Sequence, residues 1–522
     1  MRGRRAFLVG LAGGSAAVLL SFAFRLLLGV TYLPEMAAQT LFSLTPGFLE
    51  SRAVETLGPL AKESAFVGAS VLLALILGAI PYLVERVGRM PEGPVPRFAL
   101  FLLLPYAVML LPGLVFIQVA QVSTQPSSLA ALAMSLVPPS LLYGASTGYL
   151  LKVYPLTAPI LTPRRARRRE FERRRRFFMK TTVGAAAAAA ILYFGLGLLF
   201  SKQTSQGSAA EADQILAAGV TPNSKFYRVD VNVIPPTVDS TTWTLKLHGL
   251  VTNPMSLTYD QLTALPSVQE YATLQCVSNQ VGGDLMSTAL WKGISLRDLL
   301  TRAGVQPDAG YVVFRCYDGY DVGIPLDRAM MPGSILAYQM NGENLPVEHG
   351  FPLRAIVPGL YGMMNAKWIT EIEVVGGVYE GFWQRRGWTN IAKYQTAAIL
   401  LSPGDSLLRD KFPVAPSFTN GPDGSTPIVG VAFAGDRGIS KVEVSTDSGT
   451  SWQNASLVDP LSNYTWVFWK LEWNPPAAGS YKIMVRATDG QGKVQVSTMT
   501  DPFPNGATGY HVVDFRVDAP TG

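Results

Sequence analysis

The stretch "YATLQCVSNQVGGDLMSTALWKGISLRDLL" (Tyr271–Leu300) contains one of only two cysteines in a chain of 522 residues. A short β-rich run ends at Cys276, and Gly282 and Gly283 predict a turn soon after it. The thiol is therefore expected at the end of a strand. A structural cysteine usually lies in an apolar environment. Two interpretations stay open on this evidence: a thiol buried in the core, or a thiol that takes part in chemistry.

Outward from this stretch, the chain after residue 200 contains short alternating runs such as "WTLKLHGLV", "KVEVSTDSG" and "SYKIMVRATDG". Runs of this kind, bounded by Gly, Asp and Asn, predict β-strands. Helical segments are fewer, and one of them, "SLRDLLTRAG", ends at Gly304. We therefore expect an α+β domain over residues 206–399 and an all-β domain over residues 400–522. The turn-rich segment Leu400–Pro413 marks the boundary.

The first 160 residues are expected to form an all-α region of four transmembrane helices. Each apolar stretch is about 20 residues long or more, which is enough to cross a hydrocarbon core about 30 Å thick. The four stretches are Ala6–Val30, Ser64–Val84, Phe98–Ala120 and Leu129–Leu151. Residues 161–205 are expected to hold a basic cytoplasmic loop and a fifth span, Thr181–Phe200. The lipid bilayer is thus a predicted partner of this multi-pass chain.

The net charge of +6 is concentrated in Arg164–Lys180, which holds ten basic and two acidic residues. A nucleic-acid-binding protein has basic residues spread over a folded surface, so we expect no nucleic-acid partner. Positive loops favour the cytoplasmic side. With five spans, the N-terminus is cytoplasmic and the chain after residue 200 is extracytoplasmic. "RRFFMK" (Arg175–Lys180) resembles a twin-arginine export signal, and a simple positively charged anchor is the alternative.

The residue types that hold common redox centres are scarce. The chain has three histidines, all after residue 200, and no CxxC or CxxCH motif. A b-type haem most often needs histidine ligands, and an iron–sulfur cluster needs several thiolates. We therefore expect neither haem nor an iron–sulfur cluster, and two cysteines cannot build a disulfide framework.

Several separated motifs together resemble one known family. "TLQCVSN", "WKGISLRDLL" and "LAYQMNGENLPVEHGFPLRAIVPGLYGMMNAKWITEIE" are similar to the cofactor core of the sulfite oxidase family of molybdopterin oxidoreductases. The later "GVAFAGDRGISKVEVSTDSGTSWQNASL" resembles the immunoglobulin-like domain that follows this core. The resemblance runs from about residue 221 to residue 518. It implies an enzyme with a molybdenum–molybdopterin cofactor, an immunoglobulin-like sandwich, and a homodimer through the C-terminal domain.

The resemblance also implies roles for individual residues. Cys276 would give its thiolate to molybdenum, and a soft thiolate suits such a metal. Cys316, inside the strand-like "VVFRCYDGY", is expected to be a core thiol. The remaining positions are implied to bind the pterin or its phosphate, for which Arg and Lys are suitable partners. These are Arg228, Asp318, His349, Arg354, Asn365 and Lys367.

The chain departs from the family's sulfite enzymes in two places. Those enzymes have arginines shortly after the cysteine, where this chain has Gln280 and Val281. Trp388 stands where the family has an active-site tyrosine, and Arg386 nearby remains a possible anion contact. An indole N–H donates a hydrogen bond but does not give up a proton as a phenol can.

These departures lead us to expect a neutral oxygen-atom donor, such as a sulfoxide, as the small-molecule substrate. Sulfite oxidation is the first alternative, and a redox-silent binding or sensor protein is the second. With neither haem nor cluster motifs, electrons would be exchanged with a separate partner, namely a quinone, a cytochrome or another redox protein.

Overall fold

The computed structural model is divided into a helical unit and a larger, strand-rich unit, which are described separately. The residues that the structure describes are 2–28, 32–45, 49, 60–87, 94–120, 129–153, 219–232, 234–402, 408, 411 and 426–517. The basic segment, the twin-arginine-like motif and the fifth predicted span lie outside these residues. The predictions about them stay predictions.

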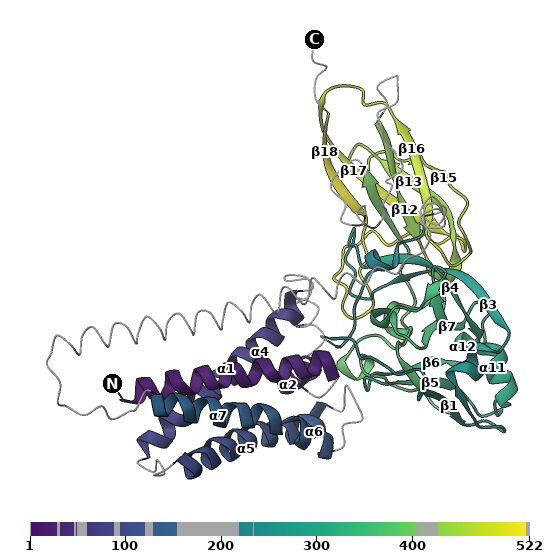
Figure 1. The fold of residues 1–522 in the computed structure, drawn as a ribbon. Helices are drawn as coiled ribbons and strands as arrows, with labels where there is room; N and C mark the ends of the chain where they lie inside the picture. Colours follow the sequence, from purple (N-terminus) through teal and green to yellow (C-terminus); the bar gives the residue numbers. More distant parts are fainter. Residues whose placement is uncertain are drawn as a thin grey trace. The chain divides into compact units, whose positions relative to one another are not determined.

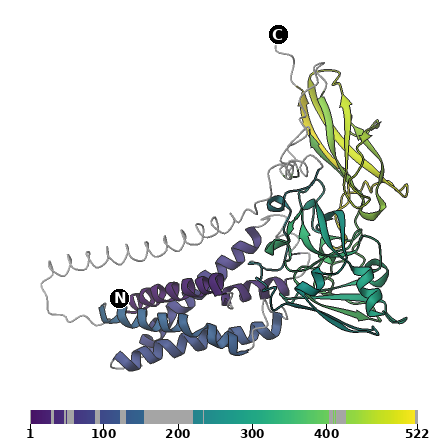
Figure 2. The same ribbon diagram turned by 45° about the vertical axis from the view of Figure 1, so that its right-hand side comes forward.

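The helical unit contains long apolar helices that run alongside one another (purple and blue in Figures 1 and 2). The helices are α1 (Arg2–Leu28), α2 (Leu33–Leu44), α4 (Leu60–Arg86), α5 (Pro94–Ala120), α6 (Leu129–Ser135) and α7 (Val137–Val153). α1 packs against α4 and α7, and α5 packs against α2 and α7.

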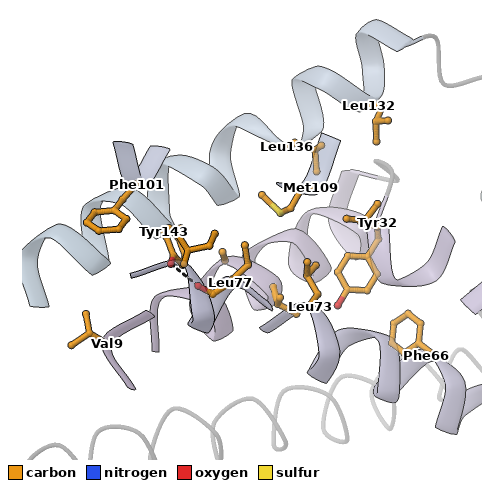
Figure 3. Close-up of a cluster of buried hydrophobic side chains, with 14 of the residues drawn as sticks. Val9, Tyr32, Phe66, Leu73, Leu77, Phe101, Met109, Leu132, Leu136 and Tyr143 are labelled. Atoms are coloured by element: carbon orange, nitrogen blue, oxygen red, sulfur yellow. Dashed lines mark hydrogen bonds between the residues drawn. The ribbon is translucent and has the colours of Figure 1, made fainter. Parts of the chain in front are cut away.

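Small residues and one buried hydroxyl hold these helices close. A Cβ on Gly10 of α1 would lie 2.6 Å from the carbonyl oxygen of Gly78 in α4, so only glycine allows this approach. Tyr143 in α7 is fully buried and donates a hydrogen bond to the carbonyl oxygen of Leu77 at 2.7 Å (Figure 3). The apolar surroundings in Figure 3 show why this hydroxyl needs a partner.

Three of the four stretches expected to be transmembrane are helices long and apolar enough to cross a membrane, judged by length and composition. They are Arg4–Leu27, Ser64–Arg86 and Val95–Leu114. The fourth stretch differs from the prediction because it forms two shorter helices, α6 and α7, with a break at Leu136. Pro138 and Pro139 follow the break, and neither has the N–H that a continuous helix would use to bond back four residues.

The strand-rich unit begins with a mixed α+β part built on two sheets. One sheet has the order β2-β1-β10-β5-β6, in which β1 and β10 are parallel, and the other has the order β3-β4-β7-β8 with β9 paired to β7. The strands are β1 (Thr244–Gly249), β2 (Met255–Thr258), β3 (Ser267–Gln275), β4 (Met286–Ser295), β5 (Tyr311–Cys316), β6 (Asp321–Pro325), β7 (Ile335–Met340), β8 (Glu343–Asn344), β9 (Arg354–Ile356) and β10 (Ile369–Val375).

Short helices connect these strands, and local sequence explains their ends. They are α10 (Tyr259–Thr263), α11 (Leu296–Ala303), α12 (Leu326–Ala329), and the 3₁₀ turns Asn223–Lys225, Val347–His349, Gly362–Met364 and Gln384–Arg386. The side chain of Ser295 accepts a hydrogen bond from the Asp298 N–H at the start of α11. Gly304 ends this helix with φ +69°, so the predicted stop at this glycine is confirmed.

The C-terminal part is a sandwich of two antiparallel sheets, drawn in yellow-green in Figure 1. Their orders are β11-β12-β16-β15 and β14-β13-β17-β18. The strands are β11 (Ala397–Ser402), β12 (Thr426–Phe433), β13 (Ile439–Ser445), β14 (Gln453–Asn454), β15 (Ser456–Leu457), β16 (Val467–Trp473), β17 (Gly479–Asp489) and β18 (His511–Val517). Trp469 of one sheet and Val485 of the other belong to the same buried core, so the sheets face each other.

A second core joins the sandwich to the α+β part. It contains Val277 and Trp388 from the α+β part and Ile399, Phe433 and Trp466 from the sandwich. The segment that follows Cys276 is therefore held from both sides of the boundary.

Candidate active site

Cys276 directly follows β3, as expected from the sequence. Its N–H donates to the carbonyl oxygen of Leu285 at 2.9 Å, and the Asn279 N–H donates to the Cys276 carbonyl oxygen at 3.1 Å. The side-chain oxygen of Asn279 accepts the Leu285 N–H at 2.9 Å. These bonds close residues 276–285 into a compact loop, which we call the cysteine loop. The thiol sulfur is 3.0 Å from the Ser278 hydroxyl, and Cys276 is only 7% exposed.

Four buried tyrosines lie close enough to Cys276 for a thiolate there to influence their pKa values, and no pattern in the sequence indicated them. Burial raises the pKa of Tyr227, Tyr320, Tyr361 and Tyr394, and the charge of a Cys276 thiolate raises each of these values further. For Tyr361 the pKa reaches about 12. All four phenols therefore stay protonated at neutral pH and act as neutral hydrogen-bonding groups. These tyrosines have no common spacing in the chain that could have indicated a site.

Arg354 and His349 form a buried basic pair. Arg354 begins β9, and its Nη1 donates to the carbonyl oxygen of His349 at 3.2 Å. Its guanidinium carbon lies 5.2 Å from the ring centre of Trp291. Burial, with a smaller contribution from Arg354, lowers the pKa of His349 to about 3. The ring is therefore neutral, and its Nε2–H donates to the carbonyl oxygen of Asn223 at 3.0 Å.

Lys367 and Arg228 share one carboxylate, that of Asp230. Lys367 Nζ donates to Asp230 Oδ2 at 3.0 Å and to the Glu348 carbonyl oxygen at 3.2 Å. Arg228 Nε is also 3.0 Å from Asp230 Oδ2, although the Arg228 side chain is 38% exposed. Burial lowers the pKa of Lys367 to about 8. Asp230, two residues after Arg228 in "YRVD", was not singled out from the sequence.

The thiol and Arg354 lie around the same buried aromatic residues, because Cys276, Tyr227 and Trp291 share one core and the Arg354 guanidinium lies over the Trp291 ring. Around the phenol of Tyr227, burial is the main cause of its raised pKa, the Cys276 thiolate raises it further, and Arg354 lowers it. Arg354 in turn lowers the pKa values of His349 and Lys367. We call Arg228, His349, Arg354 and Lys367, together with Asp230, the cation cluster. Its three full cations and one carboxylate leave an excess of positive charge, because His349 is neutral.

Two other predicted cofactor residues hold loops in this structure. Asp318 lies between β5 and β6, is 1% exposed, and accepts the Tyr320 N–H at 3.1 Å. Asn365 accepts the Val357 N–H at 2.7 Å and donates to two carbonyl oxygens, of residues 360 and 361, at 3.2 and 3.1 Å. These bonds use the side chain of Asn365 to fold its own loop. Direct contacts of either residue with a cofactor stay predictions.

Trp388 shares a buried core with Val277 of the cysteine loop, and Arg386 precedes it by two residues in the chain. Trp388 is 6% exposed and packs in the core shared with the sandwich, with its ring centre 5.2 Å from that of Phe503. Arg386 donates to the carbonyl oxygen of Phe382 at 2.5 Å, and its guanidinium lies 3.5 Å from the centre of the Phe382 ring. Cys316, at the end of β5, is buried, and burial raises its pKa well above the usual value.

The site has the properties of a receptor for a buried anionic group. Among the described residues, ten buried side-chain polar atoms have no hydrogen-bond partner, and three of them belong to this region: Nε of Arg354, Oε1 of Gln275 and Nδ2 of Asn279. Gln275 and Asn279 lie on either side of Cys276 in the chain, and Arg354 is in the cation cluster. An anion with donors and acceptors would satisfy such atoms and offset the excess positive charge. Among the described residues, no group of three or more His, Cys, Asp and Glu is suited to hold a metal.

Comparisons with known proteins identify the family of this chain. The model of the oxidoreductase molybdopterin-binding domain matches residues 232–383, and that of the Mo-co oxidoreductase dimerisation domain matches residues 414–505. Mitochondrial sulfite oxidase of Rattus norvegicus is 32% identical over 321 residues, which is 54% of this chain and 58% of that protein. The uncharacterized oxidoreductase YuiH of Bacillus subtilis (strain 168) is 34% identical over 186 residues, which is 35% of this chain and 91% of that protein.

Among solved structures, the sulfane dehydrogenase SoxCD from Paracoccus pantotrophus superposes with a TM-score of 0.48 at 20% identity, covering 60% of this chain and 86% of that one. The chain spans less than two thirds of the length of the mammalian sulfite oxidases it matches, 58% for the Rattus norvegicus protein. The resemblance deduced from the motifs is nevertheless confirmed, and with it the molybdopterin cofactor. The chain belongs to the sulfite oxidase family of molybdopterin-dependent oxidoreductases, with a dimerisation domain after the molybdopterin-binding domain.

Proposed function

We propose that this chain is a membrane-anchored enzyme that performs two-electron oxygen-atom transfer at a molybdenum held by Cys276. One observation carries the proposal: the buried thiol of Cys276 shares a core with Tyr227 and Trp291, and the buried guanidinium of Arg354 lies over the Trp291 ring. The bound cofactor would supply the oxygen-atom and electron chemistry. The chain would supply one thiolate ligand and the charges that hold an anionic pterin.

The proposed roles follow from the chemistry of each side chain. Arg354 and Lys367 would bind the phosphate, because a guanidinium fork and an ammonium group both suit phosphate oxygens. Neutral His349 would accept a hydrogen bond from the pterin through Nδ1, since its Nε2–H is donated to Asn223, or keep Arg354 in place. Arg228, at the exposed edge, would close the cluster. Asp318, Asn365, Trp388 and Arg386 would shape the loops around the cofactor and the substrate.

We propose a neutral oxygen-atom donor such as a sulfoxide as the substrate. The cysteine loop carries Gln280 and Val281 where cations would be needed for a dianion, and burying a dianion without cations is costly. Reduction of a sulfoxide takes up two electrons and two protons and releases a thioether and water. The electrons would come from a separate partner, namely a quinone, a cytochrome or another redox protein.

Sulfite oxidation is the competing function, favoured by the mammalian and other relatives that carry that name. Steady-state assays of the purified chain with dimethyl sulfoxide and with sulfite, each with an artificial electron carrier, separate the two. We expect the sulfoxide to have the higher kcat/KM by at least about a hundredfold, because two lost charge-assisted contacts are worth about 3–6 kcal/mol. Efficient oxidation of sulfite at micromolar concentration would contradict this proposal.

Cofactor content distinguishes an enzyme, whether it reduces sulfoxides or oxidises sulfite, from a redox-silent binding protein. Roughly one molybdenum and one pterin per purified chain is the expected result for an enzyme. A folded chain with neither, isolated from a host that makes the cofactor, would favour the binding protein.

The proposed location is the cell membrane, with the N-terminus in the cytoplasm and the cofactor domain outside it. The three apolar helices support the anchoring by their length and composition. A homodimer through the C-terminal domain is supported by the dimerisation-domain match. Protease added to spheroplasts is expected to release a soluble fragment that contains the cofactor domain, and full protection of that domain would contradict the orientation.

A further inference from the structure

A pocket of about 390 Å³ lies where the cysteine loop meets the C-terminal sandwich. Gln280 and Val281 of that loop form one side of it. The other side comes from the sandwich, from Met499–Pro502 and from Ala507 and Tyr510–Val512. Ligand pockets in proteins typically measure about 300–1,000 Å³, so this volume suits an organic molecule much larger than sulfite.

His511 fixes the wall of this pocket against the cysteine loop. Its Nδ1 accepts the N–H of Leu400 at 3.0 Å, so a neutral ring carries its proton on Nε2. Burial lowers the pKa of His511 to about 4, which keeps the ring neutral. A Cβ on Gly282, where φ is +77°, would lie 2.4 Å from Nε2. The ring and the loop are therefore in close contact, and the pocket has a defined shape on this side.

The charge of the lining is negative. Among the described residues that line the pocket, Asp501 is an acid, and the others are neutral at pH 7 with His511 uncharged. No lysine or arginine belongs to this lining. In water, the interaction energy between a carboxylate and a unit charge about 4 Å away is about 1 kcal/mol. This energy corresponds to about a fivefold change in affinity. The pocket should attract cationic groups and repel anionic ones by roughly this factor.

The pocket is also within reach of the thiol. The hydrogen bond from Asn279 to Cys276 closes a turn, which keeps the Cα atoms of these residues within about 7 Å. Gln280 follows directly, and one residue adds at most about 3.8 Å. A substrate about 11 Å long could therefore have one end in the pocket and the other near Cys276.

We infer that this pocket holds the non-reacting end of an organic substrate, and that Asp501 selects a cationic or neutral end over an anionic one. The inference rests on the proposed function, which it refines by naming the charge and size of the substrate. Asp501 acts here as a specificity-determining residue in the sandwich. Val281, Met499 and Pro502 of the lining supply apolar surface for the part of the substrate between its two ends.

The test uses three probes, each about 11 Å long when extended: 7-(methylsulfinyl)heptan-1-amine, 7-(methylsulfinyl)heptan-1-ol and 7-(methylsulfinyl)heptanoate. Binding to the full-length wild-type chain in detergent, with no electron donor, is measured by isothermal titration calorimetry at pH 7. The expected order of affinity is amine, alcohol, carboxylate, with about fivefold between the charged ends and the alcohol at low salt. Asp501→Asn should bring the three affinities within about twofold, and Asp501→Lys should reverse the order.

Asp514→Asn is the matched control, because Asp514 is an exposed acid on β18 of the same sandwich that does not line the pocket. It should leave the order unchanged. Equal affinities for the three probes in the wild-type chain, or the same order after Asp501→Lys, would overturn the inference. Turnover measurements distinguish the pocket proposal from the proposed function. Reduction of the sulfoxides with no preference among the three end groups would refute only the role of the pocket. Binding that depends on Asp501 with no reduction of the sulfoxide would refute only the proposed function.

Discussion

Replacing Lys367 with methionine should weaken retention of the pterin cofactor about 10- to 100-fold while the fold persists. The Lys367 side chain is 12% exposed, and burial lowers its pKa from 10.5 to about 8. This difference corresponds to about 3 kcal/mol, which is the cost of keeping the buried ammonium charged in the cofactor-free chain. One charge-assisted hydrogen bond to a bound anion is worth about 1.5–3 kcal/mol, and this range corresponds to the expected loss of affinity.

The assay is molybdenum and pterin content after dialysis of the purified variants. Lys393→Met is the control, because Lys393 is an exposed lysine of the same domain. Wild-type content in Lys367→Met under conditions that begin to strip the wild-type chain would refute the assignment of Lys367 to the anion.

The same lowered pKa fixes the direction of the pH dependence. In the cofactor-free chain, the folded state binds fewer protons than the unfolded state between pH about 8 and 10.5. The cost of the buried charge is therefore present in full below pH 8 and disappears by about pH 10.5, so stability rises across that window. Anion affinity should fall across the same window as Lys367 loses its charge, by at most tenfold per pH unit. Lys367→Met should remove both trends, which thermal unfolding and pterin retention between pH 7 and 10 would measure.

Three further predictions concern other parts of the molecule. Cys276→Ala should lose molybdenum and turnover because it removes the proposed metal ligand; full metal content by elemental analysis would disprove that role. Gln280→Arg should lower the KM for sulfite by at least about tenfold, since it adds one charge-assisted contact, and an unchanged KM would argue against the cysteine loop as the site of selection. Glu35→Gln should destabilise the helical unit by about 3–5 kcal/mol, because Glu35 is 2.6 Å from Arg25 with side-chain exposures of 2% and 5%; an unchanged unfolding temperature in detergent would refute this estimate.

Local patterns were sufficient to predict the elements on which the site is built. The run that ends at Cys276 forms β3, and "SLRDLLTRAG" forms α11 with its stop at Gly304. Alternation of apolar residues and the chemistry of caps act over a few residues, so they can be recognised without knowledge of the fold. The helical region was predicted less well, because the predicted fourth span is interrupted where Pro138 and Pro139 cannot donate.

The sequence by itself determined the family, the order of the domains, and the candidate positions Cys276, His349, Arg354 and Lys367. Their environment was decided by contacts between distant parts of the chain. Lys367 meets Asp230 across 137 residues.

The tyrosines around the thiol and the pocket at the boundary with the sandwich have the same long-range origin. No periodic pattern in the sequence around Tyr394 marks it as a site residue. Its hydroxyl oxygen nevertheless accepts the Gln275 N–H at 3.4 Å. Asp501 and Gln280 line one pocket although more than two hundred residues of chain separate them. Burial, shared counter-charges and pocket shape depend on which segments pack together, and only the tertiary structure specifies this packing.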